Sequence, residues 1–317
     1  MRIAILGATS QIAKDLILSF SRLENHELVL FARQTKIVQE WLKQSSLLDS
    51  YLVKPYESIY DQPPFDALIN FVGVGDPAKA VQMGASIFDL TVKFDSIALD
   101  YLHTHPECRY IFLSSGAVYG SDFAVPANEN MQASFPMNQL LPHHWYGIAK
   151  LHAESRHRAL ENLAIVDIRV FNYFSHTQNM SAQFLMTDIA KAISERSIFR
   201  TSADHVVRDF LHPMDFYQLI SRVLTAPKTN CVIDCYSQAP VDKSMLLKTL
   251  HEKFDLNYQI LDGESGINAT GKKPFYYSLN RSASQFGYEP LYSSLDGICR
   301  ELSLYLQGAG MNSSEAK

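Results

Sequence analysis

The sequence has few of the features that mark secreted, membrane-spanning or nucleic-acid-binding proteins. Only 4 of its 317 residues are cysteines, which suits a reducing cytosol better than a disulfide-bonded exterior. No apolar run approaches the roughly 20 residues that span a bilayer. Lys and Arg number 28 against 33 Asp and Glu, giving a net charge of −5. That balance argues against a nucleic-acid binder, which needs a basic stripe, and against docking on anionic membranes.

The sequence also lacks a secretory signal and a clear metal site. Residues 1–7 enter a strand-like segment directly, without a charged lead, a long apolar stretch or a cleavage site. We therefore expect a cytoplasmic protein. Cys231 and Cys235 have a three-residue gap that can occur at metal sites, but no second Cys/His pair is near them in sequence. Buried reduced thiols are favoured there, and we expect no metal.

What the first half of the chain does contain is a regular alternation of short apolar strands and helical patterns. Strands are expected at 3–6, 27–32, 51–53, 67–72, 110–114 and 165–170, and helices at 12–22, 37–48, 88–104 and 150–163. Apolar strands that alternate with helices indicate a parallel sheet covered on both faces. The expected fold class is α/β, a doubly wound parallel Rossmann sheet with its ligand at the carboxyl ends of the strands.

The alternation weakens after residue 172. Helices are expected at 184–196, 213–224, 241–255 and 295–306, with a strand at 231–235, a loop at 262–273 and a frayed tail at 308–317. We expect a Rossmann domain over 1–170 and a smaller, interleaved α/β domain over 171–317. Part of the second domain, about 206–236, is expected to return to the Rossmann sheet.

The segment between the first strand and the first helix is typical of a turn that binds a pyrophosphate. Its sequence is Gly7-Ala8-Thr9-Ser10-Gln11-Ile12-Ala13. Backbone N–H groups of such a turn point at the pyrophosphate, and the helix dipole favours its charge. Ser10 stands where the second glycine is usual; its Cβ narrows the approach, while its hydroxyl can donate to a phosphate oxygen. The predicted cofactor contacts are Gly7, Thr9, Ser10, Gln11 and Ile12, with a simple strand-to-helix turn as the alternative.

The end of the second strand distinguishes the two nicotinamide cofactors. A carboxylate there binds the ribose 2′-hydroxyl of NAD, whereas an arginine accommodates the 2′-phosphate of NADP. The sequence Leu30-Phe31-Ala32-Arg33-Gln34 offers no acid and one arginine. Arg33 therefore favours NADP over NAD, the alternative being a solvated loop arginine.

Three residues form a candidate proton-transfer set. Tyr146 and Lys150 are four apart and lie on one face of a helix. A nearby ammonium stabilises a phenolate, so we expect Lys150 to lower the pKa of Tyr146 from its reference of about 10. Ser115 follows an apolar strand and can bind a substrate hydroxyl or carbonyl. With a nicotinamide nearby, the expected chemistry is hydride transfer at a C–OH/C=O centre.

Together these motifs resemble the NAD-dependent epimerase/dehydratase family of extended short-chain dehydrogenases/reductases, which act on nucleotide-sugars. Residues 114–120, Ser-Ser-Gly-Ala-Val-Tyr-Gly, are similar to the family's S-S-x-x-V-Y-G. Residues 169–172 are similar to its R-x-x-N, and residues 208–215 to its R-D-[FY]-[IV]-H-V-x-D. Residues 280–290 are a weaker match to a late motif. The matches occur in the family's order and span nearly the whole chain.

The resemblance implies roles for individual residues. Tyr146 would be the catalytic acid/base, Lys150 would hold the nicotinamide ribose, and Ser115 would bind the reacting oxygen. Asn172 would contact substrate, and Arg208 would pair with the nucleotide diphosphate, with Lys272 or Lys273 as a second basic group. Residues 1–170 would bind NAD(P) and residues 171–317 the nucleotide-sugar. A homodimer built from the helices at 88–104 and 150–163 is also implied.

Several positions depart from the family pattern and narrow the reaction. Tyr56 or Glu57 occupies the place of the adenine-side aspartate, and Asn70-Phe71-Val72-Gly73 replaces the usual H-L-A-A. No Asp-Glu pair lies near Ser115, which argues against a dehydratase.

Arg33 favours NADPH-dependent reduction of a 4-keto-sugar nucleotide. An NAD-dependent nucleotide-sugar 4-epimerase is the alternative, since the same three residues serve both reactions. A non-enzymatic dinucleotide-sensing scaffold is a remote alternative, because such proteins typically lose the tyrosine or the lysine.

Overall fold

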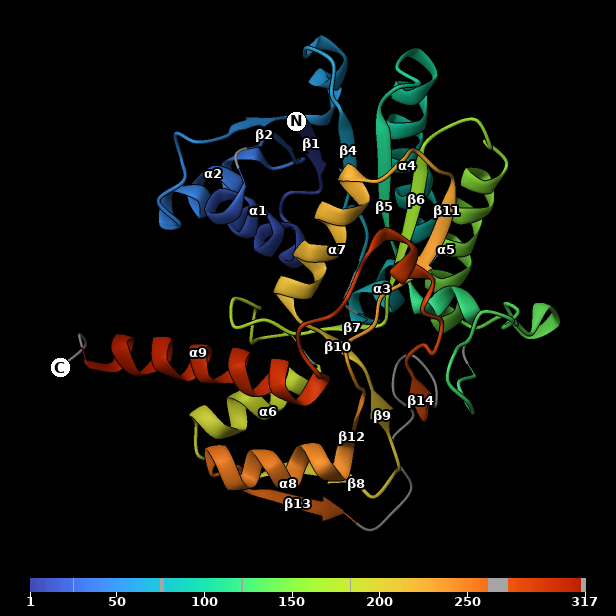
Figure 1. The fold of residues 1–317 in the computed structure, drawn as a ribbon. Coiled ribbons are helices and arrows are strands. Elements are labelled where there is room, and N and C mark those ends of the chain that lie inside the picture. The colour runs from blue at the N-terminus through green and yellow to red at the C-terminus, as the bar shows by residue number, and fades with distance from the viewer. Residues whose placement is uncertain (25, 75–76, 121, 183, 262–272, 315–317) are drawn as a thin grey trace.

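A seven-stranded parallel sheet forms the centre of the larger lobe (Figure 1). The computed structural model describes the whole chain except residues 25, 75–76, 121, 183, 262–272 and 315–317. The strand order is β11-β6-β5-β4-β1-β2-β3. Strand β1 therefore lies inside the sheet, with β2 and β3 on one side and the later strands on the other. The strands are β1 (Arg2–Leu6), β2 (Glu27–Phe31), β3 (Leu52–Lys54), β4 (Ala67–Asn70), β5 (Arg109–Ser115), β6 (Ile165–Val170) and β11 (Cys231–Asp234).

Both faces of the sheet are apolar because both are covered by helices. Ile5 of β1 is paired with Leu30 of β2 and Ile69 of β4, and all three are buried. The helices α1 (Gln11–Leu23), α2 (Thr35–Gln44) and α7 (Pro213–Thr225) pack on one face. On the other face lie α3 (Pro77–Met83), α4 (Ser86–Thr104) and α5 (Pro142–Arg158). Each face has its own core of buried side chains.

A smaller lobe lies at the carboxyl ends of the strands (Figure 1). Its helices are α6 (Leu185–Ser194), α8 (Lys243–Phe254) and α9 (Ser294–Ser314), which share a core that includes Ile189, Leu250 and Leu302. Its short strands are β7 (Asn172–Tyr173), β8 (Phe199–Ser202), β9 (Val207–Arg208), β10 (Phe210–Leu211), β12 (Val241–Asp242), β13 (Tyr258–Leu261) and β14 (Phe275–Tyr276). Short 3₁₀ helices occur at Tyr56–Asp61, Gly116–Tyr119, Met137–Gln139 and Ser282–Phe286.

The predicted fold class, a doubly wound parallel Rossmann sheet, is confirmed. β11 hydrogen-bonds to β6 in parallel, after the chain has passed through the smaller lobe. The division into two domains near residue 170 stays a prediction.

Four expected element boundaries are wrong. The helix expected at 37–48 ends at Gln44. The helix expected at 150–163 begins at Pro142, a residue suited to the first turn of a helix. The segment 241–255 starts as strand β12, and Asp242 then caps α8 by accepting hydrogen bonds from the N–H groups of Ser244 and Met245. The tail expected to fray from Gly308 instead continues α9 to Ser314, because an established helix extends one hydrogen bond at a time. The loop expected over 262–273 lies almost wholly outside the described residues.

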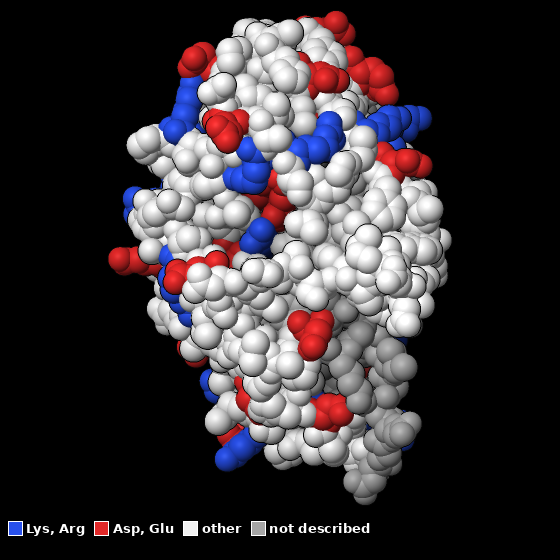
Figure 2. Space-filling view, turned by 90° about the vertical axis from the view of Figure 1, so that its right-hand side faces the viewer, with Lys and Arg blue, Asp and Glu red and all other residues white. Residues whose placement is uncertain are grey.

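The surface mixes charges of both signs. Figure 2 views the molecule from the right-hand side of Figure 1, and on this face Lys and Arg side chains lie among Asp and Glu side chains. Within the described part of the chain, no helix combines the length and the apolar character needed to cross a bilayer.

Candidate active site

The turn between β1 and α1 requires glycine at its first position. Gly7 has φ +80°, and a Cβ there would lie 2.9 Å from the backbone nitrogen of Val72. Ser10, the residue before α1, is extended, and its side chain makes no capping hydrogen bond. The first N–H groups of the 13-residue helix α1 therefore have no side-chain cap, which suits an anion such as the diphosphate of a dinucleotide.

The other predicted turn residues differ in accessibility. Thr9 is exposed, whereas Ile12 is half-buried and packs against the core on the face of the sheet that α1, α2 and α7 cover. Gln11 donates its side-chain amide to Asp15 at 3.2 Å and to Thr177. Thr177 in turn donates to Asp15 at 2.5 Å. This cluster joins the start of α1 to the segment that follows β7.

Arg33 lies just beyond β2, beside the turn. The carbonyl of Phe31 accepts hydrogen bonds from the N–H groups of both Gly7 and Ala8, at 3.0 and 3.1 Å. Arg33 follows Phe31 by two residues, and its side chain is exposed. Burial raises the pKa of Tyr56 to about 12, and the charge of Arg33 opposes that rise, so the two side chains are neighbours. An exposed guanidinium is chemically suited to bind a phosphate group.

Two phenols meet at Ser115, at the carboxyl end of β5. The Ser115 Oγ lies 3.3 Å from the hydroxyl of Tyr276 and accepts a hydrogen bond from the N–H of Ala117 at 3.2 Å. Burial raises the pKa of Tyr146, and a hydrogen bond with Ser115 opposes that rise. Burial likewise raises the pKa of Tyr276, and the nearby Tyr146 adds to the rise. Both phenols are therefore neutral proton donors at neutral pH.

Lys150 lies one turn along α5 from Tyr146 and is almost fully buried. Its Nζ donates to the carbonyl of Leu113 at 2.7 Å and lies 4.2 Å above the ring of Phe112. Burial lowers the pKa of Lys150 to about 8. The expectation that Lys150 depresses the pKa of Tyr146 differs from the structure, where burial of the phenol outweighs other effects and the shift is upward.

The residues expected to bind substrate lie where the smaller lobe meets β7 and β14. Asn172 uses its amide to hold backbone, donating to the carbonyls of Asp209 at 3.1 Å and Tyr276 at 3.3 Å. Arg208 is half-buried and donates to the carbonyl of Lys273 at 2.6 Å. Burial lowers its pKa to about 10. Asn172 and Arg208 therefore help to hold β14 near Ser115.

Lys273 is the second basic group at this place, and its alternative Lys272 lies outside the described residues. Its Nζ lies 4.6 Å from the centre of the Tyr276 ring and 5.7 Å from that of Phe123. Burial lowers the pKa of Lys273 to about 8, and the charge of Arg208 lowers it further. Two neighbouring cations suit a ligand with more than one negative charge.

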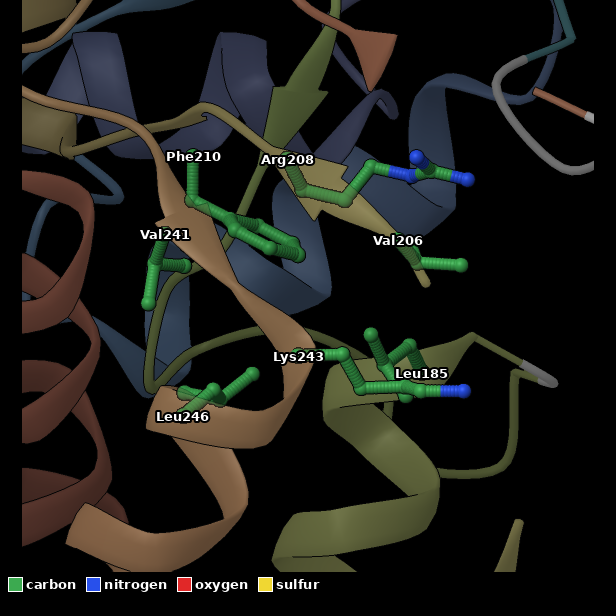
Figure 3. A pocket seen from close by; sticks show the side chains of 7 residues that line it. All are labelled: Leu185, Val206, Arg208, Phe210, Val241, Lys243 and Leu246. Atoms are coloured by element: carbon green, nitrogen blue, oxygen red, sulfur yellow. The ribbon is translucent and has the colours of Figure 1, made fainter. Parts of the chain in front are cut away.

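A small pocket, with Arg208 in its lining, lies in the smaller lobe between β9, β12 and the start of α8 (Figure 3). Arg208 and Lys243 extend in one direction in this view, away from Val241. Lys243 donates to the carbonyl of Ser202 at 2.7 Å. Apolar side chains of Leu185, Phe210 and Leu246 make up much of the rest of the lining. The pocket therefore belongs to the packing of the smaller lobe and does not include Ser115 or Tyr146.

Tyr276 is the residue that the motifs did not predict. It is 130 residues along the chain from Tyr146, in a two-residue strand with no periodic pattern. The one signal in the sequence was the adjacent pair Tyr276-Tyr277 next to the basic residues at 272–273. The pairing of β14 with β9 helps to bring its hydroxyl to Ser115.

The cysteines are free thiols among the described residues: Cys108 and Cys235 are buried, while Cys231 and Cys299 are half-buried. The described residues hold no group of three or more His, Cys, Asp or Glu side chains placed to bind a metal ion.

Comparison with known proteins places this geometry in a family. The model of the "NAD dependent epimerase/dehydratase family" matches residues 3–233, about three quarters of the chain. The curated relatives include UDP-glucose 4-epimerase 4 of Oryza sativa subsp. japonica, 32% identical over 120 residues. That match covers 37% of this chain and 31% of the relative. UDP-glucose 4-epimerase 2 of the same plant is 30% identical over 120 residues, 37% of this chain and 28% of the relative.

Solved structures share the fold along nearly the whole chain. A UDP-glucose-4-epimerase from Stenotrophomonas maltophila has a TM-score of 0.80 at 15% identity, covering 98% of this chain and 99% of that one. A UDP-glucuronic acid 4-epimerase from Bacillus cereus gives 0.77 at 16%, covering 97% and 99%. A dTDP-glucose 4,6-dehydratase from Bacillus anthracis gives 0.77 at 16%, covering 97% of each chain. The family match and the shared architecture agree, and the chain belongs to the NAD-dependent epimerase/dehydratase family.

Proposed function

We propose that the protein is an NAD(P)-dependent oxidoreductase that acts on a nucleotide-activated sugar, and specifically that it reduces a 4-keto-sugar nucleotide with NADPH. The observation that carries the proposal is the meeting of Tyr146 with Ser115 at the end of β5, with Lys150 one turn away. This is a proton donor and a carbonyl-binding hydroxyl beside a turn suited to a dinucleotide.

The reaction needs a proton, which Tyr146 can supply. A bound dihydronicotinamide would supply the hydride. Tyr146 keeps its proton because it is buried, so it can donate to the ketone oxygen as negative charge develops there. Ser115 can donate a hydrogen bond to the same oxygen and hold it in reach of Tyr146. Arg208 and Lys273 carry positive charge near Tyr276 and suit the diphosphate of the substrate.

Replacing the phenol tests the proposal directly. We expect Tyr146→Phe to lower kcat by about 10²–10⁴-fold, the usual contribution of a general acid, with little change in cofactor binding. The measurement is NADPH oxidation with a 4-keto-sugar nucleotide. Tyr258→Phe, on the exposed strand β13, is a matched control that keeps full activity. Full activity in Tyr146→Phe overturns the assignment and revives a scaffold without catalysis.

Arg33 supports NADPH as the cofactor. Its guanidinium is exposed at the end of β2, and residues 31–34 include no carboxylate. We expect Arg33→Ala to weaken NADPH binding by about 10-fold or more while leaving NADH binding nearly unchanged, because one charged contact to the 2′-phosphate is lost. Fluorescence titration with each cofactor measures this, and Lys36→Ala, an exposed cation of α2, is the control. Equal weakening for both cofactors contradicts the role.

NAD-dependent 4-epimerisation is the second candidate. The names of the two curated relatives support it, although each match covers about a third of the relative's length. An epimerase oxidises and re-reduces the same sugar and retains its cofactor. Absorbance and mass spectrometry of the purified protein separate the candidates. Stoichiometric bound NAD together with interconversion of two UDP-sugars favours epimerisation, whereas exchangeable NADPH that is consumed favours reduction.

We also propose that the protein works as a homodimer in the cytoplasm. Half-buried apolar side chains on α4 and α5, among them Val92, Ile97 and Ile148, support pairing of these helices between two copies. Free thiols on the described cysteines suit a reducing compartment. Light scattering after size-exclusion chromatography gives the mass, and a monomer at micromolar concentration contradicts the dimer.

A further inference from the structure

A fully buried histidine lies between two fully buried carboxylates behind the candidate site. The ring of His157 contacts Asp95 Oδ1 through Nε2 at 2.7 Å and Asp167 Oδ1 through Nδ1 at 2.6 Å. All three side chains are 0% exposed. They come from three elements, α4, α5 and β6. The two carboxylates raise the pKa of His157 to about 9 against the opposing effect of burial, so the imidazole is positively charged at neutral pH.

This cluster occupies a place where apolar side chains are expected. The face of α5 that packs on the sheet carries Lys150, Glu154 and His157, at a helical spacing of four and three residues. The outer oxygens of the carboxylates accept hydrogen bonds from arginines that reach the surface. Arg156 donates to Asp95 at 2.8 Å and Arg158 to Asp167 at 2.9 Å. Apolar residues of similar volume often stabilise a fold as well as buried ion pairs do, so stability alone does not account for this cluster.

The side chain of Phe112 on strand β5 contacts both the cluster and Lys150. The centre of its ring lies 4.2 Å from the Lys150 Nζ and 5.1 Å from the centre of the His157 ring. The groups that face Lys150 come from every element packed around it. They are Asp95 on α4, Glu154 on α5, Asp167 on β6, and the Phe112 ring and Leu113 carbonyl on β5.

A hydrogen-bonded path also leads from the cluster to the end of β4. Tyr110 donates to Asp95 Oδ1 at 2.9 Å and accepts from the amide of Asn70 at 2.8 Å. Asn70 accepts from the N–H of Val72 at 2.9 Å, and Val72 borders Gly7. Asn70 is one of the positions that depart from the family pattern, so the cluster and this departure form one network.

We propose that Asp95, His157 and Asp167 form a charge cluster that acts as a set of positioning residues, holding the Lys150 ammonium charged and in place for the proposed reaction. The catalytic role of the cluster rests on the proposed function, whereas its electrostatic effect on Lys150 does not. Burial alone disfavours the ammonium, and Asp95, Glu154 and Asp167 oppose that effect. His157 hydrogen-bonds both carboxylates and so fixes their positions relative to Lys150.

The test reads the charge of Lys150 without substrate. The pH dependence of the Lys150 ¹³Cε chemical shift in the full-length protein labelled with ¹³C-lysine, assigned by the loss of its signal in Lys150→Arg, gives its titration midpoint. We expect Asp95→Asn, which keeps the shape but removes the charge, to lower that midpoint by about one pH unit. His157→Gln removes the positive charge but keeps a side chain that can hydrogen-bond the two carboxylates, so the midpoint should rise. Asp100→Asn, an exposed carboxylate of α4, is the control and should shift nothing.

Midpoints of Lys150 that move in opposite directions in Asp95→Asn and His157→Gln indicate an electrostatic role for the cluster. If the cluster served packing alone, both variants would be less stable but the midpoint would not move. Asp167→Asn gives the same expected sign as Asp95→Asn and serves if the first variant fails to fold. An unchanged Lys150 midpoint in the folded aspartate variants overturns the proposal. A shifted midpoint in a protein that lacks reductase activity keeps the cluster's role and rejects the proposed reaction instead.

Discussion

Individual hydroxyl groups decide the chemistry of the candidate site. Ser115 receives contacts from Tyr146 on α5 and Tyr276 on β14, so one hydroxyl joins the larger lobe to the smaller one. A serine hydroxyl has one proton to donate and two lone pairs to accept with. When a substrate oxygen takes one of these positions, the remaining phenol keeps Ser115 oriented.

We therefore expect Tyr276→Phe to lower kcat by about 10-fold, because the loss of one hydrogen bond to Ser115 leaves the serine free to rotate. The ring that contacts Lys273 is kept, so substrate affinity should change little. Steady-state kinetics measure the split between kcat and KM, and Tyr277→Phe next to it is the control. A change in KM with kcat intact assigns Tyr276 to substrate binding alone.

Part of this site is predictable from residue types and spacing. Ser115, Tyr146 and Lys150 carry recognisable spacings, and the structure brings Ser115 and Tyr146 together. The predicted direction of the Tyr146 pKa shift is wrong because desolvation depends on the burial of the phenol, which a spacing does not contain. Tyr276 has no such signal, because its position depends on the pairing of two-residue strands.

Among the elements, α5 packs unusually close to the loop that follows β5. Gly147 lies within α5, and a Cβ there would be 2.4 Å from the carbonyl oxygen of Ala117. Tyr146 and Lys150 stand on either side of it in the sequence. The glycine lets this helix approach the backbone after Ser115, and so sets the distance between the phenol and the serine.

We expect Gly147→Ala to destabilise the protein by about 1–3 kcal/mol, opposite to the usual gain for this change within a helix. Gly308→Ala in α9 is the matched control, because its Cβ would meet nothing within 4 Å; it should stabilise by up to about 1 kcal/mol. Urea denaturation measures both. Stabilisation by Gly147→Ala shows that α5 can move away from the loop.

Element prediction succeeds where the pattern is long. The strands of the central sheet are apolar on both faces and lie within one or two residues of their expected positions, as at 165–170. The strands β7, β9, β10, β12 and β14 have two residues each, which is too short for any period. Their pairing depends on side chains such as Asn172, which bonds to backbone of β14, and no local pattern reports such contacts.

At the scale of the whole molecule, Glu301 fastens the C-terminal helix to both lobes. Its carboxylate accepts hydrogen bonds from the N–H and Nδ1 of His176, at 2.8 and 2.6 Å, and lies 2.9 Å from Nε2 of His212 at the start of α7. These contacts, the first among them the hydrogen bond to His176, outweigh burial and lower the pKa of Glu301 to about 2. His176 precedes Thr177, which contacts Gln11 and Asp15 in α1.

A lowered carboxyl pKa stabilises the fold above the unfolded value of about 4.5, and this contribution is lost as pH falls from there through about 2. We expect Glu301→Gln to cost about 3 kcal/mol at pH 6, with the difference from wild type shrinking as pH falls toward 3. Denaturant unfolding across this range measures it, with exposed Glu252→Gln as the control. A pH-independent difference rejects an ionic role for Glu301.

The late arrival of β11 has a consequence for synthesis of the chain. β6 borders β5 on one side and β11 on the other, but β11 ends only at Asp234. While the ribosome is still making the intervening residues, the edge of β6 stays open to strand addition by another nascent chain. A fragment cut at residue 170 keeps that edge open permanently, so it should aggregate even though it carries the whole dinucleotide turn.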